Sequence, residues 1–370
     1  MIPIPDAVLL IAMRQIGDVL LITPLLRSLR RAWPRTRIDV LVFANKGGVL
    51  EGNPDCSEVI SVSEKPDLAE YRHLARRIWR RYDLAVNTLA GDRPHLMALL
   101  AARQRIGPIY ERNWKSLWKR AVNREWVWLD NVSTPTVIQN LALLDCLGIT
   151  PCYEVVPPHD PTAETTLDAL LPFPWREIPY AVLHLQPNWR YKQWSQEGWR
   201  TLMAHLAERG LRVVLTGGPN TEEMALAQAM AQTLPATVTS LAGQVGFGVL
   251  SRLLAGAACY VGPDTAMTHL AAACGVPTLA LYGPSNPVKW GPWPQGATAD
   301  QSPWRTLARP WQQQGNVLLL QGAQPPERSA CLPCHEEGCD QHKGSHSRCL
   351  DLLSAEQVIE ALNALIGKLG

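Results

Sequence analysis

The chain has 370 residues, too many for one ordinary hydrophobic core and about right for two domains of roughly 150–180 residues each. Apolar residues make up 46% of the chain and charged residues 18%, which excludes an intrinsically disordered protein. The formal net charge is only +2, so overall charge does not favour a nucleic-acid partner. No apolar run reaches the roughly 20 residues that a transmembrane helix needs.

The N-terminal apolar run 7–13 (AVLLIAM) ends at a polar turn, as expected of a strand buried on both faces. Asp6 precedes it, and Arg14-Gln15 follows it where a signal peptide would carry small residues. We therefore expect a buried strand rather than a signal peptide. On this interpretation the protein is cytoplasmic, and its nine cysteines are reduced unless they bind a metal.

Strand-like and helix-like segments then alternate through the first half. Apolar residues recur at helical spacing from Val19 to Ala32, and 68–82 has the pattern of an amphipathic basic helix. The other predicted elements of this half are strands at 37–43 and 83–89, a helix at 95–102 and an edge strand or loop at 104–109. Such alternation predicts a parallel sheet with helices on both faces.

A proline-dense stretch at 151–179 separates this half from a second series of alternating elements. The second series comprises predicted strands at 180–186, 212–218, 259–263 and 277–283 and predicted helices at 195–210, 220–234, 248–257, 264–275 and 354–369. The sequence thus predicts two doubly wound α/β, Rossmann-like domains that face a central cleft, with ligands bound beyond the carboxyl ends of the strands.

The domain boundaries follow from this division. We expect an N-terminal domain at 1–155, a proline-rich linker at 156–178 that acts as a hinge, and a C-terminal domain at 179–352. The C-terminal domain includes a cysteine-rich loop at 329–350. The last segment, 353–370, is expected to be a helix, and packing back on the N-terminal domain is one option for it.

The stretch Gly262-Pro263-Asp264-Thr265 lies where a predicted strand passes into a predicted helix. The first amides of a helix have no partner within it, and the helix dipole is positive at that end, so a diphosphate could bind there. We assign this role to the helix start, residues Thr265, Ala266, Met267, Thr268 and His269. The alternative is that Asp264 is a plain helix cap.

Three further features follow predicted strands. Lys192, in NWRYKQW, could reach a phosphate as a mobile point charge. Gly217-Gly218 permits a close approach of the backbone to a nucleotide. In the first half, Gly17 allows a tight turn and Asp18 stands at a helix start, where a carboxylate could take a proton from an attacking hydroxyl. Each of these residues could also serve only the fold, Asp18 as a helix cap.

Four segments in this order carry a resemblance to a known family: RQIGDVLLITPLLRSLRRAWP, NWRYKQWSQEGW, VVLTGGPNTEE and YVGPDTAMTHLAAACGVPTLALYGPSNPVKWGPW. Together they resemble the lipopolysaccharide heptosyltransferases, glycosyltransferases of family 9 with the GT-B fold, over nearly the whole chain. WGPW and the cysteine-bearing tail look most like the heptosyltransferase III subgroup.

The resemblance implies an inverting transfer of heptose from ADP-L-glycero-D-manno-heptose to the inner core of lipopolysaccharide. It implies that Asp18 is the general base, that Lys192 contacts the donor phosphates and that Asp264 holds the heptose hydroxyls. The helix start after Asp264 would bind the diphosphate. No Asp-x-Asp motif is present to hold a catalytic metal, and no cofactor is expected for catalysis.

One departure from the family pattern precedes the lysine. Family members commonly have small hydroxyl or glycine residues there, whereas this chain has Gln186-Pro187-Asn188. Pro187 offers no amide donor, so we expect either rearranged phosphate contacts or a different donor. Asn188 is included among the expected donor-binding residues.

The acceptor of such an enzyme is a phosphorylated, lipid-anchored sugar at the cytoplasmic face of the inner membrane. The segment 111–128 (ERNWKSLWKRAVNREWVW) mixes basic residues with tryptophans, which suits an anionic glycolipid surface and peripheral membrane contact. The alternative is an ordinary surface helix that covers its own core. The expected acceptor-binding residues are Gly17, Arg93, Lys115, Lys119 and Arg120.

The tail CLPCHEEGCDQHKGSHSRC spaces its four cysteines as C-x2-C-x4-C-x9-C. Such a set can hold a structural metal, zinc ahead of iron, through Cys331, Cys334, Cys339 and Cys349. His335, His342 and His346 are spare ligands. Disulfides and free thiols are the alternatives.

Two other functions stay open at this point. A glycosyltransferase with another nucleotide sugar would share these motifs. A non-catalytic, metal-stabilised binding protein could also retain the fold.

Overall fold

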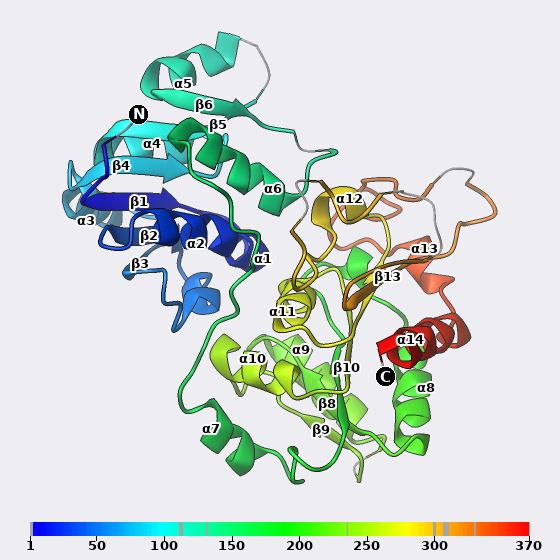
Figure 1. The fold of residues 1–370 in the computed structure, drawn as a ribbon. Coiled ribbons are helices and arrows are strands. Elements are labelled where there is room, and N and C mark those ends of the chain that lie inside the picture. The colour runs from blue at the N-terminus through cyan, green and yellow to red at the C-terminus, as the bar shows by residue number, and fades with distance from the viewer. Residues whose placement is uncertain are drawn as a thin grey trace. The chain divides into compact units, whose positions relative to one another are not determined.

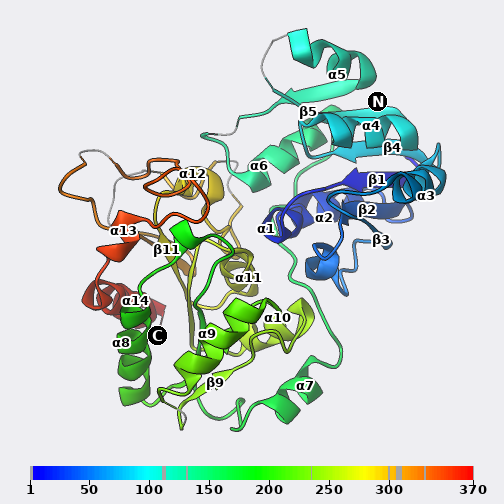
Figure 2. The ribbon, with the colours of Figure 1, turned by 180° about the vertical axis from the view of Figure 1, so that it is seen from behind.

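The computed structural model describes residues 3–110, 114–130, 132–234, 236–298, 301–305, 311–328 and 331–369. The chain forms two compact units, one reaching to Pro158 and the other taking up nearly all of the chain from His159 on (Figures 1 and 2). Each unit contains its own sheet. Within the described parts of the chain, no helix combines the length and apolar character needed to cross a membrane.

The first unit contains a six-stranded parallel sheet with the order β3-β2-β1-β4-β5-β6. Its strands are β1 (Ala7–Ile11), β2 (Arg37–Phe43), β3 (Glu58–Val62), β4 (Tyr82–Asn87), β5 (Ala102–Ile109) and β6 (Glu125–Trp128). The strand order reverses between β1 and β4, and in doubly wound sheets ligands bind at that point.

Helices cover this sheet on both faces (Figure 1). They are α1 (Ile16–Leu20), α2 (Thr23–Ala32), η1 (Gly47–Leu50), α3 (Leu68–Ile78), α4 (Asp92–Ala101), η2 (Trp114–Ser116), α5 (Leu117–Val122), α6 (Thr136–Leu141) and η3 (Ala142–Leu147). On one face, Leu9 and Ile11 of β1 form an apolar cluster with Leu74 of α3 and Ala98 of α4.

The helix predicted for 19–32 is divided into α1 and α2. Pro24 has no amide to donate to the carbonyl of Leu20, so the first helix cannot continue through it. The hydroxyl of Thr23 donates to that carbonyl instead, at 2.8 Å. The break leaves α1 as a single turn that carries Asp18 directly after β1.

The second unit contains a seven-stranded sheet with the order β12-β13-β11-β10-β7-β8-β9, parallel except for β12. Its strands are β7 (Tyr180–His184), β8 (Arg212–Thr216), β9 (Val238–Ser240), β10 (Cys259–Pro263), β11 (Thr278–Tyr282), β12 (Trp311–Gln314) and β13 (Val317–Gln321). The order β9-β8-β7-β10-β11-β13 repeats that of the first sheet, so the prediction of two Rossmann-like halves is confirmed.

The helices of the second unit pack on both faces of this sheet. They are α7 (Ala163–Leu170), η4 (Arg190–Lys192), α8 (Gln196–Glu208), α9 (Thr221–Ala231), α10 (Phe247–Ala255), α11 (Ala266–Cys274), α12 (Pro287–Trp290), α13 (Arg348–Asp351) and α14 (Ala355–Leu369). Ser195 caps α8 by accepting the amide of Gly198, and Ser354 forms a reciprocal capping box with Gln357 at α14.

The C-terminal helix packs within the second unit. Val358, Leu362 and Leu365 of α14 are fully buried in the same apolar cluster as Trp199 of α8. The apolar face of this helix is therefore buried within the second unit.

The predicted linker is mostly folded as well. Within it, α7 forms, and Leu167 and Trp175 are buried. The change of unit falls between Pro158 and His159, at the start of the segment expected to act as a hinge.

Candidate functional site

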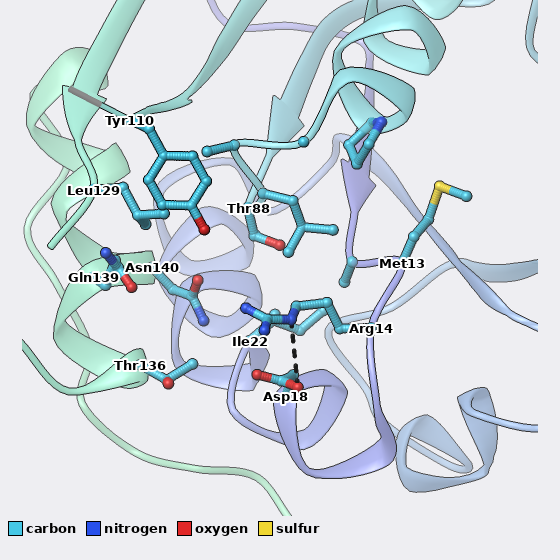
Figure 3. Close-up of a pocket in the computed structure, with 15 residues that line it drawn as sticks. Met13, Arg14, Asp18, Ile22, Thr88, Tyr110, Leu129, Thr136, Gln139 and Asn140 are labelled. Atoms are coloured by element: carbon cyan, nitrogen blue, oxygen red, sulfur yellow. Dashed lines mark ion pairs between the residues drawn. The ribbon is translucent and has the colours of Figure 1, made fainter. Parts of the chain in front are cut away.

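A pocket of about 280 Å³ lies in the first unit at the carboxyl ends of β1 and β4 (Figure 3). Met13 and Arg14 follow β1, and Thr88 follows β4. The wall labelled Thr136, Gln139 and Asn140 in Figure 3 comes from α6. Because the order of strands reverses between β1 and β4, the pocket occupies the position where this sheet type binds ligands.

Asp18 lines this pocket from the first turn of α1 (Figure 3). The residue at the helix cap is Gln15, so Asp18 is not a cap, and its carboxylate is directed elsewhere. Its Oδ2 lies 3.6 Å from Nε of Arg14, and its side chain is 16% exposed. The structure thus places a partly buried carboxylate beside a guanidinium in the pocket.

The α6 wall supplies polar groups that sequence reasoning missed. Asn140 donates from Nδ2 to the carbonyl of Leu21 at 3.1 Å, which ties α6 to the chain after α1. The hydroxyl of Thr136 is buried and has no hydrogen-bond partner within the described residues. A predicted helix at this position would have drawn attention to these side chains. The six residues 136–141, however, are too few to show a clear helical periodicity.

The residues predicted to bind the acceptor lie in different places, and neither Arg93 nor Gly17 lines the pocket. Arg93 is not in the pocket: it donates to the carbonyls of Glu64 and Ser63, and its guanidinium lies over Phe43. Gly17 is in α1 beside Asp18, but it does not line the pocket.

The remaining predicted acceptor residues belong to the α5 segment. Lys119 donates to the carbonyl of Ala90, a pocket residue, and forms an ion pair with Asp92. The guanidinium of Arg120 lies 5.1 Å from the ring centre of Trp128. The side chain of Lys115 lies outside what the structure describes.

A second group of predicted residues gathers in the second unit. Nζ of Lys192, at the end of η4, lies 2.6 Å from Oδ2 of Asp264. The hydroxyl of Tyr282 donates to the carbonyl of Trp290 at 2.6 Å and lies 3.3 Å from Oδ1 of Asp264. Asp264 directly follows β10, but the cap of α11 is Thr265, so Asp264 is not the helix cap. Sequence reasoning missed Tyr282, which appears in the sequence only as the end of an apolar strand.

The charge state of this group follows from its burial. Burial is the largest influence and would raise the pKa of Asp264, but the Lys192 ammonium, the hydrogen bonds from Lys192 and Ser285 and the charge of His269 together lower that pKa. Burial lowers the pKa of His269, one turn along α11, to about 4, so its imidazole is neutral at pH 7. Nδ1 of His269 is buried without a hydrogen-bond partner in the described part of the chain.

The start of α11 offers fewer groups to an anion than expected. The amides of Thr268 and His269 donate to the carbonyl of Thr265, and the hydroxyl of Thr268 donates to Pro263. Thr268 is fully buried, so its predicted contact with a diphosphate is wrong for both its amide and its hydroxyl. The helix-start amides of Ala266 and Met267 remain the groups suited to a phosphate.

The other predicted donor residues lie near loops of the same unit. The amide of Gly218 donates to Oε2 of Glu223 at 2.6 Å, and a Cβ on Gly218 would lie 3.1 Å from that oxygen. Burial raises the pKa of Glu223 despite this bond. Gly217 accepts the amide of Gly243, and Asn188 is exposed. The glycine pair is thus packed against Glu223.

The metal site predicted at the cysteine-rich tail is not shown by the structure. Burial, and then the neighbouring thiols of Cys334, Cys331 and Cys339, raise the pKa of Cys349 to about 12, so the four sulfurs are near one another. Among the described residues, however, no three Cys, His, Asp or Glu side chains are grouped so that they could hold a metal ion. None of the nine cysteines forms a disulfide, so the structure does not support the disulfide alternative.

Comparisons with known proteins agree with the fold and with the sequence motifs. The model of glycosyltransferase family 9 (heptosyltransferase) matches residues 71–302. Lipopolysaccharide heptosyltransferase 3 of Escherichia coli is 30% identical over 303 residues, which cover 76% of this chain and 84% of that protein.

Two solved structures share the fold over nearly the whole length. The E. coli ADP-heptose lipopolysaccharide heptosyltransferase II superposes with a TM-score of 0.72 at 21% identity, covering 98% of this chain and 99% of that one. The E. coli heptosyltransferase WaaC with ADP gives a TM-score of 0.69 at 19% identity, covering 97% and 99%. With the GT-B fold, the family match and the curated relative in agreement, the chain belongs to glycosyltransferase family 9, the heptosyltransferases, and is a glycosyltransferase.

Proposed function

We propose that this enzyme transfers heptose from ADP-heptose to the inner core of lipopolysaccharide, with inversion at the anomeric carbon. The observation that carries the proposal is the placement of Asp18 in the pocket at the carboxyl ends of β1 and β4. The names of the relatives support the substrates: one acts on lipopolysaccharide, one is an ADP-heptose enzyme and one was solved with ADP.

In the proposed reaction, the first unit binds the acceptor and Asp18 accepts the proton of its attacking hydroxyl. The hydroxyl oxygen forms a bond to the anomeric carbon of the heptose, and the bond from that carbon to the diphosphate oxygen breaks. ADP leaves with the electron pair. Inversion follows because the new bond forms on the face opposite the leaving group.

The second unit would bind the donor. The helix-start amides of Ala266 and Met267, together with Lys192, would stabilise the negative charge that develops on ADP. Lys192 is paired with Asp264 in this structure, so donor binding would exchange that partner for the diphosphate. Asp264 would then be available to accept hydrogen bonds from the heptose hydroxyls. These groups supply the positive charge, so the proposal requires no metal for ADP departure.

The base is tested with Asp18→Asn, which keeps the side-chain shape and removes the proton acceptor. We expect kcat to fall by about 10²–10⁴-fold while donor binding is retained. The matched control is Asp92→Asn, which neutralises an exposed carboxylate on α4. Unchanged transfer by the Asp18 variant would exclude Asp18 as the base, and an α-to-α or β-to-β outcome in the NMR spectrum of the product would exclude inversion.

The donor is tested by thermal shift with ADP-heptose, UDP-sugars and GDP-sugars. We expect stabilisation by ADP-heptose and by ADP, and little by the others. A response to UDP- or GDP-sugars alone would favour a glycosyltransferase with another donor. Binding of ADP-heptose without transfer to any core acceptor would favour a non-catalytic relative.

We also propose that the segment from η2 through α5 to β6 makes peripheral contact with the cytoplasmic face of the inner membrane. It exposes Trp114 by 77%, Leu117 by 57% and Trp128 by 47%, and it carries Arg120 and Arg124. Exposed aromatic and apolar side chains among cations suit an anionic lipid surface.

This contact is tested by sedimentation with vesicles of phosphatidylglycerol and phosphatidylcholine. Trp114→Ser should weaken the binding to anionic vesicles. Trp79→Ser, which removes a 58% exposed tryptophan after α3, is the matched control and should not. Equal binding by both variants and the wild type would refute the assignment of the surface.

A further inference from the structure

The wall of the Asp18 pocket is partly backbone. Thr88, Leu89, Ala90 and Gly91, between β4 and α4, all line it. A loop of this kind has carbonyls that no sheet or helix satisfies, and buried carbonyls require partners. The partners of these carbonyls decide how firmly the wall is held.

Three consecutive carbonyls of this loop are each bound by a different side chain. Nδ2 of Asn87, at the end of β4, donates to Leu89 at 2.6 Å. Nζ of Lys119, on α5, donates to Ala90 at 2.7 Å. Nδ1 of His95, on α4, lies 2.8 Å from the carbonyl oxygen of Gly91. The wall is therefore anchored to three elements at once.

Two of these anchors are buried polar side chains that also approach each other, with Nδ2 of Asn87 3.2 Å from Nδ1 of His95. Asn87 and His95 are both fully buried, and Asn87 also accepts the amide of Leu89 through Oδ1 at 2.9 Å. A bond from His95 to a carbonyl requires a proton on Nδ1. Burial lowers the pKa of His95, which keeps the ring neutral with a single proton, and Nε2 is buried without a partner in the described part of the chain.

The third anchor comes from the segment that carries the exposed tryptophans. The Lys119 side chain is only 12% exposed, whereas its ion-pair partner Asp92 is 70% exposed. An ion pair with an exposed partner contributes little, so the bond to the Ala90 carbonyl is the contact expected to matter. The neighbouring Trp118 ring lies edge-on to His95, with 6.0 Å between ring centres.

We propose that Asn87, His95 and Lys119 are positioning residues that fix the pocket wall through these carbonyls and thereby set the affinity for the acceptor. The role in acceptor affinity rests on the proposed function, whereas the anchoring of the wall is independent of it. The residues touch the loop rather than the substrate, so they act through Leu89, Ala90 and Gly91.

The first test compares two substitutions of His95. His95→Leu removes the donor, whereas His95→Asn places an amide nitrogen near the position of Nδ1. The leucine variant loses the bond to the Gly91 carbonyl, which should loosen the wall as a whole. We therefore expect hydrogen exchange at the Leu89 amide, in the same wall, to become about tenfold faster in His95→Leu, with partial rescue in His95→Asn. In transfer assays, the acceptor KM should rise by about the same factor while the donor KM stays constant.

A second pair of variants, Lys119→Met and Asp92→Asn, tests the same proposal if His95→Leu does not fold. Lys119→Met retains most of the aliphatic stem but loses the bond to Ala90. Asp92→Asn removes only the ion pair and is the control. We expect a raised acceptor KM and faster loop exchange with Lys119→Met and neither with Asp92→Asn.

The two readouts separate the inference from the proposed function. Unchanged hydrogen exchange in the variants would overturn the anchoring, whatever the activity. Faster exchange with an unchanged acceptor KM would overturn the role in acceptor affinity. Faster exchange in a protein whose wild type transfers no heptose would support the anchoring and refute the proposed function.

Discussion

The ammonium of Lys192 lies 2.6 Å from the carboxylate of Asp264, although 72 residues separate them in the chain. Asp264 is only 7% exposed and Lys192 19%, so the pair is largely removed from water. An attraction between partly buried charges is strong, and a buried charge without its partner is costly. The pair therefore links the stability of the second unit to the residues that the proposed function uses for the donor.

Removal of the cation should destabilise the protein. Lys192→Met leaves the buried Asp264 carboxylate without its counter-charge, and we expect the free energy of unfolding to fall by about 2–3 kcal/mol, below the cost for a fully buried pair because Lys192 is partly exposed. Lys192→Arg keeps the charge and should lose less. Urea denaturation at pH 7 measures both, and a loss under about 0.5 kcal/mol in the methionine variant would contradict the argument.

Buried histidines should make the protein sensitive to mild acid. Burial lowers the pKa of both His184 and His269 from 6.5 to about 4. A histidine in the unfolded chain therefore binds a proton at a higher pH than in the folded protein, so stability is full above pH 6.5 and is lost as the pH falls toward 4. Each histidine should contribute up to about 1.4 kcal/mol per pH unit in this window.

The measurement is urea denaturation at several pH values between 7 and 4.5. Replacing His269 with asparagine should make the loss of stability with falling pH less steep. Replacing the exposed His73 on α3 with asparagine is the control and should leave the slope unchanged. An equal slope in the His269 variant and the wild type would show that His269 does not titrate as described.

The cysteine-rich tail should affect the donor side. The hydroxyl of Ser347 donates to the carbonyl of Tyr191 at 2.5 Å, next to Lys192. Ser347→Ala removes this support of η4, so we expect the donor KM to rise several-fold while the acceptor KM is unchanged. Ser345→Ala is the matched control, because among the described residues the hydroxyl of Ser345 bonds within the tail, to Asp340 and His346. A similar donor KM in both variants would argue against this support.

Two glycines in helices should respond to alanine in opposite directions. A Cβ on Gly198 of α8 would lie 2.4 Å from the ring of Trp194, which is 4% exposed and bonded to the carbonyl of Leu353. Gly198→Ala should therefore cost about 1–3 kcal/mol despite the better helix propensity of alanine. Gly367→Ala meets no atom within 4 Å in α14 and should be neutral or stabilising. Thermal unfolding compares the two, and a stabilised Gly198→Ala would contradict the packing argument.

The sequence by itself determined the two α/β halves and most of the buried elements. Their signals are local: continuous apolar strands such as 7–11, the serine caps at Ser195 and Ser354, and the turn after β10. The motifs around Asp18 and Asp264 were enough to indicate the family, because such residues follow the strands at fixed positions.

Only the tertiary structure decided which groups meet. The Lys192–Asp264 pair, the approach of Tyr282 and the anchoring of the pocket wall by Lys119 join residues that are far apart in the chain, and no local pattern encodes such contacts. The same reason explains the errors. Arg93 looked available but its guanidinium donates to backbone carbonyls, and Thr268 lies in the core.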